Sequence, residues 1–114
     1  MEICETERER NMDAIARRLK LYRTYQSMLA VCGSVPMLGC DCGRAERAME
    51  ALTQEVRALP LGRERLILEL HYFEGNSIEG CAELMGISRS TAFRIHRRAL
   101  EMLDFRERVR ELHA

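Results

Sequence analysis

Residues 77–95 read SIEGCAELMGISRSTAFRI and contain two short helical patterns separated by a glycine. In the first pattern the apolar residues recur at i, i+3, i+4 and i+7, the spacing of one helix face: Ile78, Cys81, Ala82 and Met85. Ser77 is placed to cap the amino end of this helix, and Gly86 can adopt a left-handed conformation at its other end without a Cβ penalty. The sequence therefore predicts a helix over residues 78–85, followed by a sharp turn.

A second helix follows this turn directly. Ile87 can enter the core between the two helices, and Ser88 can cap the second one. The inward positions of the second helix are apolar and helically spaced: Ala92, Ile95, Ala99 and Met102. Two helices that cross over a short turn form a helix-turn-helix, and Ala82 supplies the small side chain that a close crossing needs. We expect the core of this unit to consist of Ile78, Ala82, Met85, Gly86, Ile87, Ala92 and Ile95.

The outward face of the second helix is basic, although the whole chain is neutral. The chain has 18 basic and 18 acidic residues, but no acid lies between Glu83 and Glu101. Arginine can bind guanine edges through its planar fork and phosphates through its permanent charge. We therefore expect base-edge contacts from Arg89, Ser90, Phe93 and Arg94, and phosphate contacts from Ser88, Arg97 and Arg98, on double-stranded DNA. The alternative is a solvated basic helix face.

Several stretches around this unit match a known pattern: Leu59-Pro60, RERLILEL at 63–70, YFEG at 72–75, AELMGIS at 82–88, Ser90-Thr91 and RAL at 98–100. Over about residues 59–103 the chain thus resembles region 4 of sigma-70-type factors. This resemblance implies a small all-helical domain that docks on the −35 promoter element and on RNA polymerase, with its last helix in the major groove. The ending FRIHRRAL at 93–100 and the short chain are similar to small phage and prophage regulators of late genes, of the ArpU and RinA type.

The chain departs from the sigma pattern in two places. Gly80 and Cys81 stand where the family usually has an acidic residue and an isoleucine, and Ala92 replaces a β-branched residue. A glycine inside a helix costs roughly 1 kcal/mol relative to alanine. We therefore expect a less rigid first helix and no effect on the DNA face.

A third helix is expected before the helix-turn-helix. Pro60 suits its start and Gly75 suits its end, and four apolar residues share one face: Leu66, Ile67, Leu70 and Phe73. His71 and His96 lie on these helices without a carboxylate or thiol spaced to partner them, so both are interpreted as surface or packing residues.

The N-terminal half predicts a helical hairpin, residues 1–58, in front of a helix-turn-helix domain, residues 59–114. Helical apolar spacing indicates helices over about 6–30 and 44–58, and the glycines and proline of 31–43 indicate a loop. The apolar stripes must be covered either by the DNA-reading domain of the same chain or by a second copy in a homodimer. The last helix continues toward the end of the chain, because Phe105, Val109 and Leu112 keep a helical spacing. The fold class is therefore all-α.

The five cysteines do not form a recognisable metal motif. Cys32, Cys40 and Cys42 could supply thiolates, with Cys4 or Asp41 completing a site, but the spacing differs from the CxxC knuckle of structural zinc sites. We expect free thiols in a reducing cytosol, with no bound metal and no cofactor. No apolar run approaches the ~18 residues that span a membrane, so a cytoplasmic protein is expected.

These observations favour a sequence-specific DNA-binding transcriptional regulator that reads the major groove with helix 88–103. Two alternatives remain open: an interaction module that binds RNA polymerase or sigma, and a terminase-like DNA-packaging adaptor. Enzymatic activity is not expected, because no nucleophile–base pair, paired carboxylates or phosphate-binding glycine loop is present.

Overall fold

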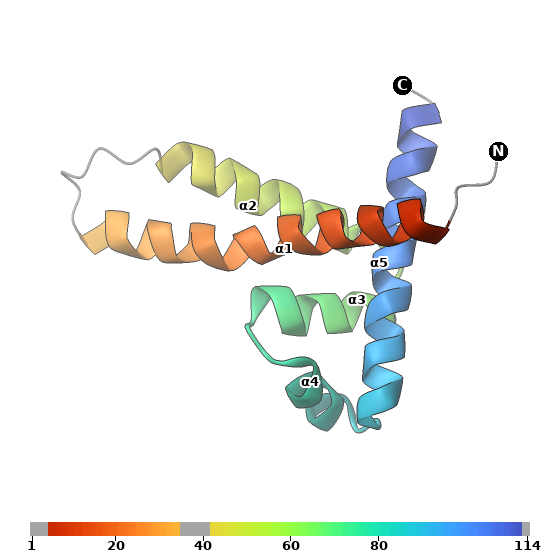
Figure 1. Ribbon diagram of the computed structural model, residues 1–114. Helices are drawn as coiled ribbons and strands as arrows, with labels where there is room; N and C mark the ends of the chain where they lie inside the picture. Colours follow the sequence, from red (N-terminus) through yellow and green to blue (C-terminus); the bar gives the residue numbers. More distant parts are fainter. Residues whose placement is uncertain (1–4, 35–41, 113–114) are drawn as a thin grey trace.

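The computed structural model describes residues 5–34 and 42–112, and every regular element in those ranges is helical. Figure 1 shows how the elements are arranged. In chain order they are α1 (Glu5–Ser34), α2 (Cys42–Arg57), α3 (Arg63–Leu68), η2 (Glu69–Phe73), α4 (Ile78–Met85) and α5 (Arg89–Leu112). The predicted all-α fold is confirmed.

The helices α1 and α2 form the predicted hairpin and lie side by side in opposite directions (Figure 1). Their bounds differ from the prediction, because α1 runs to Ser34 rather than ending near residue 30, and α2 begins at Cys42 rather than at 44. The expected loop 31–43 was therefore too long. Gly33 lies inside the last turn of α1, where a single glycine costs only about 1 kcal/mol and does not stop a long helix.

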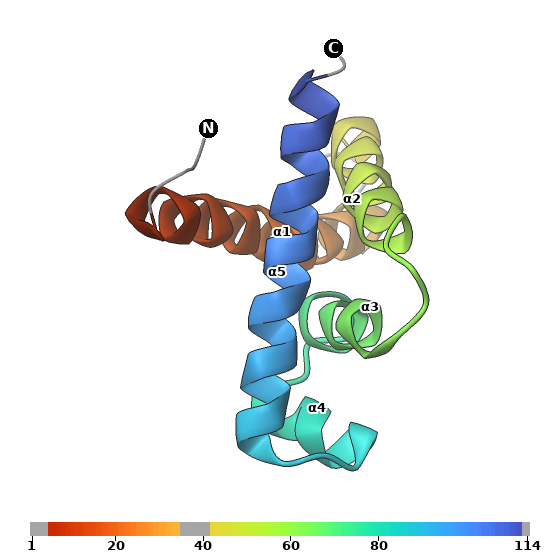
Figure 2. The same ribbon diagram turned by 90° about the vertical axis from the view of Figure 1, so that its right-hand side faces the viewer.

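The long helix α5 crosses α1 steeply, and α3 and α4 pack beside the N-terminal half of α5 (Figures 1 and 2). One apolar core joins all these helices, since Leu19, Val56 and Leu103 belong to the same buried cluster. Asp104 is also buried beside this crossing, where its Oδ2 accepts a hydrogen bond from Arg108 Nη2 at 2.5 Å. Within the described residues, the apolar faces of the hairpin pack against the DNA-reading half of the same chain, which is one of the two arrangements expected from the sequence.

The segment before α4 differs most from the sequence expectation. The helix begins at Arg63 rather than at Pro60, and its first backbone bond runs from Leu66 N–H to Gly62 O at 3.0 Å. A π-helical turn follows in η2. It is closed by a hydrogen bond from Glu74 N–H to the carbonyl of Glu69, five residues earlier, at 3.1 Å.

The buried face of this helix overlaps the predicted one only in part. Leu66 is 42% exposed, whereas Ile67, Leu68 and Tyr72 are buried. The segment contacts α5 on one side and the hairpin on another, so it buries two neighbouring residues instead of one stripe. The wide turn then changes the register of the residues that follow. Leu70 and Phe73 pack only at the edge of the core.

Candidate nucleic-acid interface

The turn between α4 and α5 has the predicted local structure. Ser77 is extended, and its Oγ accepts a hydrogen bond from Gly80 N–H at 3.0 Å, which caps α4. Gly86 is left-handed with φ 68° and ψ 35°. Ile87 N–H then bonds the carbonyl of Ala82 at 3.0 Å, which closes the end of α4. The chain reverses here because of local residue chemistry.

Ser88 caps the start of α5. Its Oγ accepts a hydrogen bond from Thr91 N–H at 3.2 Å and donates one to Thr91 Oγ1 at 2.7 Å. The side chain is exposed at the amino end of the helix. Free backbone N–H groups and the positive end of the helix dipole meet at this end, which favours an approaching anion such as phosphate.

The expected core of the helix-turn-helix is buried only in part. Four of its members are almost fully buried: Ile78, Ala82, Ala92 and Ile95. Met85 and Ile87 are half-buried against this core, and Gly86 is an exposed turn residue. Cys81 was absent from the expected core but is fully buried, and burial raises the pKa of its thiol.

The outward face of α5 brings the predicted DNA-contacting residues together on a single surface, which we name the reading face: Arg89, Ser90, Phe93, Arg94, Arg97 and Arg98. All six are exposed, and Phe93 is 44% exposed despite being aromatic. The Arg89 guanidinium carbon lies 5.7 Å from the centre of the Phe93 ring. The face thus combines permanent positive charge with one flat apolar side chain.

Three of the four arginines on the reading face are held by glutamates. Arg89 pairs with Glu79 of α4 at 3.1 Å, and Arg98 pairs with Glu64 of α3 at 3.6 Å. Arg97 pairs with Glu101, one turn further along α5, at 3.5 Å.

Arg94 differs from these three, because it forms no ion pair with any residue of 5–34 or 42–112. Its guanidinium is therefore the one most ready to meet a ligand.

Sequence reasoning missed the acidic groups around this face. It found no acid between Glu83 and Glu101 along the chain, but Glu64 and Glu79 reach the face from α3 and α4. Glu9 and Asp13 of α1 also line a hollow beside Phe93 and Arg97. No local sequence signal could locate these residues, because tertiary packing brings them to α5.

The two histidines pack against each other next to the reading face. Tyr72 Oη lies 2.7 Å from His96 Nε2, and His71 Nδ1 lies 2.6 Å from the carbonyl oxygen of Asn76. Burial, together with the charges of His71 and Lys20, lowers the pKa of His96 to about 4, and burial raises the pKa of Tyr72 to about 12. His96 is therefore neutral at physiological pH and accepts the Tyr72 hydroxyl. Its contacts are those of a packing residue.

The candidate metal site of the sequence lies largely outside the described part of the chain, because the structure does not describe the side chains of its cysteines: Cys4, Cys32, Cys40 and Cys42. Among the side chains that are described, no three His, Cys, Asp or Glu groups are arranged to hold a metal ion. No helix within residues 5–34 and 42–112 is long and apolar enough to cross a membrane.

Comparison with known proteins agrees with this geometry. Residues 62–104, which run from the start of α3 to the middle of α5, match the family model of sigma-70, region 4. Residues 62–104 form a sigma-region-4-like helix-turn-helix unit. It is a DNA-binding unit with a transcription-related role. No curated protein and no solved structure matches the chain.

Proposed function

We propose that the protein is a sequence-specific DNA-binding transcriptional regulator that inserts the N-terminal part of α5 into the major groove. One observation carries this proposal: a region-4-like helix-turn-helix presents Arg94 without an ion pair among the described residues, at the centre of an exposed basic face. A helix presented beyond a short turn is the geometry with which such units enter the groove.

The contacts divide by chemistry. Arg94 and Arg89 read guanine edges, where a guanidinium forms two parallel hydrogen bonds. Ser90 bonds a neighbouring base edge, and Phe93 contacts a thymine methyl group. The exposure of these side chains at the start of α5 supports these roles.

Phosphate contacts come from Ser88, Arg97 and Arg98, at the amino end and along the length of α5. The glutamates paired with Arg97 and Arg98 then release them, and DNA phosphates replace these carboxylates. Both arginine side chains are more than half exposed, at 55% and 72%, so the pairs are weak, at about 0–1 kcal/mol each. The ion pairs therefore hold the side chains in place without preventing DNA binding.

The regulator acts with RNA polymerase in the cytoplasm, as region 4 of a sigma factor does, and belongs to the phage and prophage late-gene type named above. The similarity of residues 62–104 to sigma-70, region 4 supports the polymerase role. The protein assembles as a homodimer through the N-terminal helices. Apolar residues near the end of α1, outside the core that α1 shares with the rest of the chain, remain exposed and support this contact: Met28 and Val31.

A second function is favoured by a specific observation. The pairing of three reading-face arginines with glutamates, together with the acidic residues of α1 nearby, fits a module that binds polymerase or sigma and rarely touches DNA. Selection of binding sites from random duplex DNA with the purified protein separates the two functions. Enrichment of a defined sequence supports the regulator, and an inverted repeat supports the dimer. Failure to enrich any sequence supports the interaction module.

A further inference from the structure

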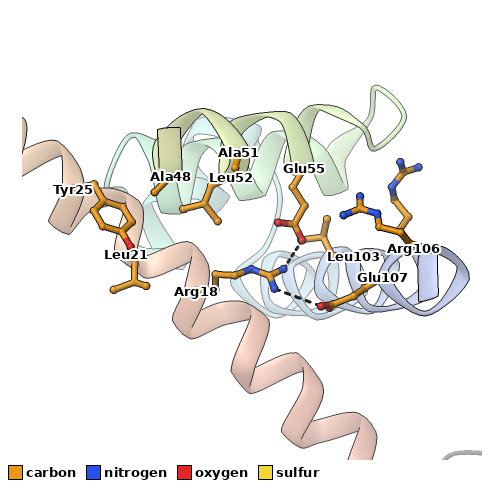
Figure 3. A pocket seen from close by; sticks show the side chains of 11 residues that line it. Arg18, Leu21, Tyr25, Ala48, Ala51, Leu52, Glu55, Leu103, Arg106 and Glu107 are labelled. Carbon is orange, nitrogen blue, oxygen red and sulfur yellow. Dashed lines mark hydrogen bonds and ion pairs between the residues drawn. The ribbon is translucent and has the colours of Figure 1, made fainter. Parts of the chain in front are cut away.

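An open groove lies between α1, α2 and the C-terminal half of α5, with a volume of about 350 Å³ (Figure 3). We name it the three-helix groove. Its apolar lining comes from all three helices: Leu21, Tyr25, Ala48, Ala51, Leu52 and Leu103. Apart from Leu103 the lining residues lie outside the segment 62–104 that matches sigma-70, region 4. The groove is therefore a feature that the hairpin adds to the helix-turn-helix.

The charges around the three-helix groove are partly neutralised. Arg18 lies between Glu55 and Glu107 and pairs with both, at 3.5 Å to the second (Figure 3). Arg106 and Arg110 of α5 line the same groove, are exposed, and form no ion pair with the rest of the described chain. The uncompensated charge at this edge is positive, so the complementary partner is acidic.

The shape of the groove identifies the kind of acidic partner. A site for a small molecule usually encloses about 70–90% of its ligand, but this groove is open along one side. Its walls are helical, and the residues from 48 to 55 on α2 and from 103 to 110 on α5 each span roughly two turns. Ala48 and Ala51 keep the α2 wall low, which lets a backbone approach. These features suit the apolar face of a docked helix.

We propose that the three-helix groove binds an acidic amphipathic helix of a protein partner. Apolar side chains of that helix fill the floor over Leu52 and Leu103, and its carboxylates pair with Arg106 and Arg110. Arg94 and Arg106 are twelve residues apart on α5, which is roughly 18 Å at about 1.5 Å per residue. Partner and DNA can thus bind together, and the partner site does not depend on the proposed DNA function.

Two labelled synthetic peptides test this proposal in the absence of DNA. Both are 14-residue amphipathic helices with leucines at i, i+3, i+4 and i+7, and their polar positions are glutamate in one and lysine in the other. Fluorescence anisotropy with the full chain measures their affinities. The glutamate peptide should bind at least tenfold more tightly than the lysine peptide, and the double variant Arg106→Glu, Arg110→Glu should reverse this preference.

Ala51→Trp fills the groove and should lower the affinity for the glutamate peptide at least tenfold. Arg57→Glu reverses one charge, where the double variant reverses two, at an exposed position of α2 outside the groove, and should leave the affinity within twofold. Circular dichroism melting of each variant verifies that it is folded. Equal binding of the two peptides, or a glutamate peptide indifferent to both groove changes, would overturn the proposal.

Other occupants of the groove give distinct results. A different outcome is that octanoate binds, that Ala51→Trp abolishes this binding, and that the glutamate peptide does not bind. The groove would then be a site for a small anionic ligand. Self-association that is seen in sedimentation experiments and is abolished by Ala51→Trp would mean that the groove binds a second copy of this chain. Either result contradicts the proposal.

Discussion

The two halves of α5 face different surroundings. Residues 89–100 project beside α3 and α4 and present the reading face, whose arginines are mostly paired with glutamates of neighbouring turns and helices. Residues 101–112 run past the hairpin, where Leu103 and Asp104 are buried and Arg106 and Arg110 form no ion pair within the described chain. One continuous helix therefore connects the reading face, which we propose binds DNA, with a surface built largely by the N-terminal hairpin.

We infer that the outward residues of the first half of α5 serve ligand binding, whereas the inward residues of the second half stabilise the fold. Side chains of the first half that point outward contribute little to the core, so they can be optimised for a ligand. Leu103 of the second half belongs to the core that α5 shares with the hairpin, so changes to such inward residues affect the whole fold. Substitutions of the outward residues of the first half and of the inward residues of the second half should consequently change different measurements.

The largest effect is expected from Leu103→Ala. Leu103 is 1% exposed and belongs to the core shared by the hairpin and α5. Its truncation should lower the free energy of unfolding by about 3 kcal/mol, from lost transfer energy and an unfilled cavity. Urea denaturation measures this change. Phe93→Ala, in the exposed half of α5, should stay within about 0.5 kcal/mol of the parent, and equal losses for both variants would refute the separation.

Acid should weaken the fold through His96, which lies next to the reading face. Its pKa is about 4 in the folded protein, below the ordinary value of 6.5, so unfolding takes up a proton between these pH values. The stabilisation is complete above pH 6.5 and is lost as the pH falls toward 4, by about 1–2 kcal/mol once its partial exposure is considered. Urea denaturation at pH 7 and at pH 4.5 measures the change. His96→Gln should show a smaller loss, and an identical pH dependence would exclude His96 as the source.

A smaller effect is expected at the turn that joins α4 to α5. Gly86 has φ 68°, and a Cβ added there would meet no atom within 4 Å, so only the backbone conformation opposes a side chain. Gly86→Ala should lower the melting temperature through a cost of about 1 kcal/mol. Gly86→Asn should lose less, because asparagine visits this conformation more readily. Equal melting temperatures for the alanine variant and the parent would mean that the turn imposes no such constraint.

Sequence reasoning succeeded where neighbouring residues determine the structure. The caps at Ser77 and Ser88 and the left-handed turn at Gly86 are formed by groups within a few residues, and all three are present in the structure. The bounds of α4 and the continuation of α5 toward the end of the chain agree with the periodic apolar pattern for the same reason.

Sequence reasoning failed where contacts between segments that are distant in sequence determine the structure. The wide turn in η2 and the outward position of Leu66 reflect contacts with α5 and the hairpin, which no local period encodes. For the candidate site, the spacing of α5 predicted which residues share a face. It could not predict that Glu64 and Glu79 pair with Arg98 and Arg89, because those acids come from other helices.

We propose that Arg94 reads bases whereas Arg97 holds phosphate. The most direct measurement is the affinity of Arg94→Ala and Arg97→Ala, over a range of salt concentrations, for a selected DNA site and for random duplex. Arg94→Ala should cost about 1–3 kcal/mol on the selected site and much less on random DNA. Arg97→Ala should weaken both DNAs alike and reduce the salt slope by about 1. Equal losses on both DNAs for both variants would contradict this account.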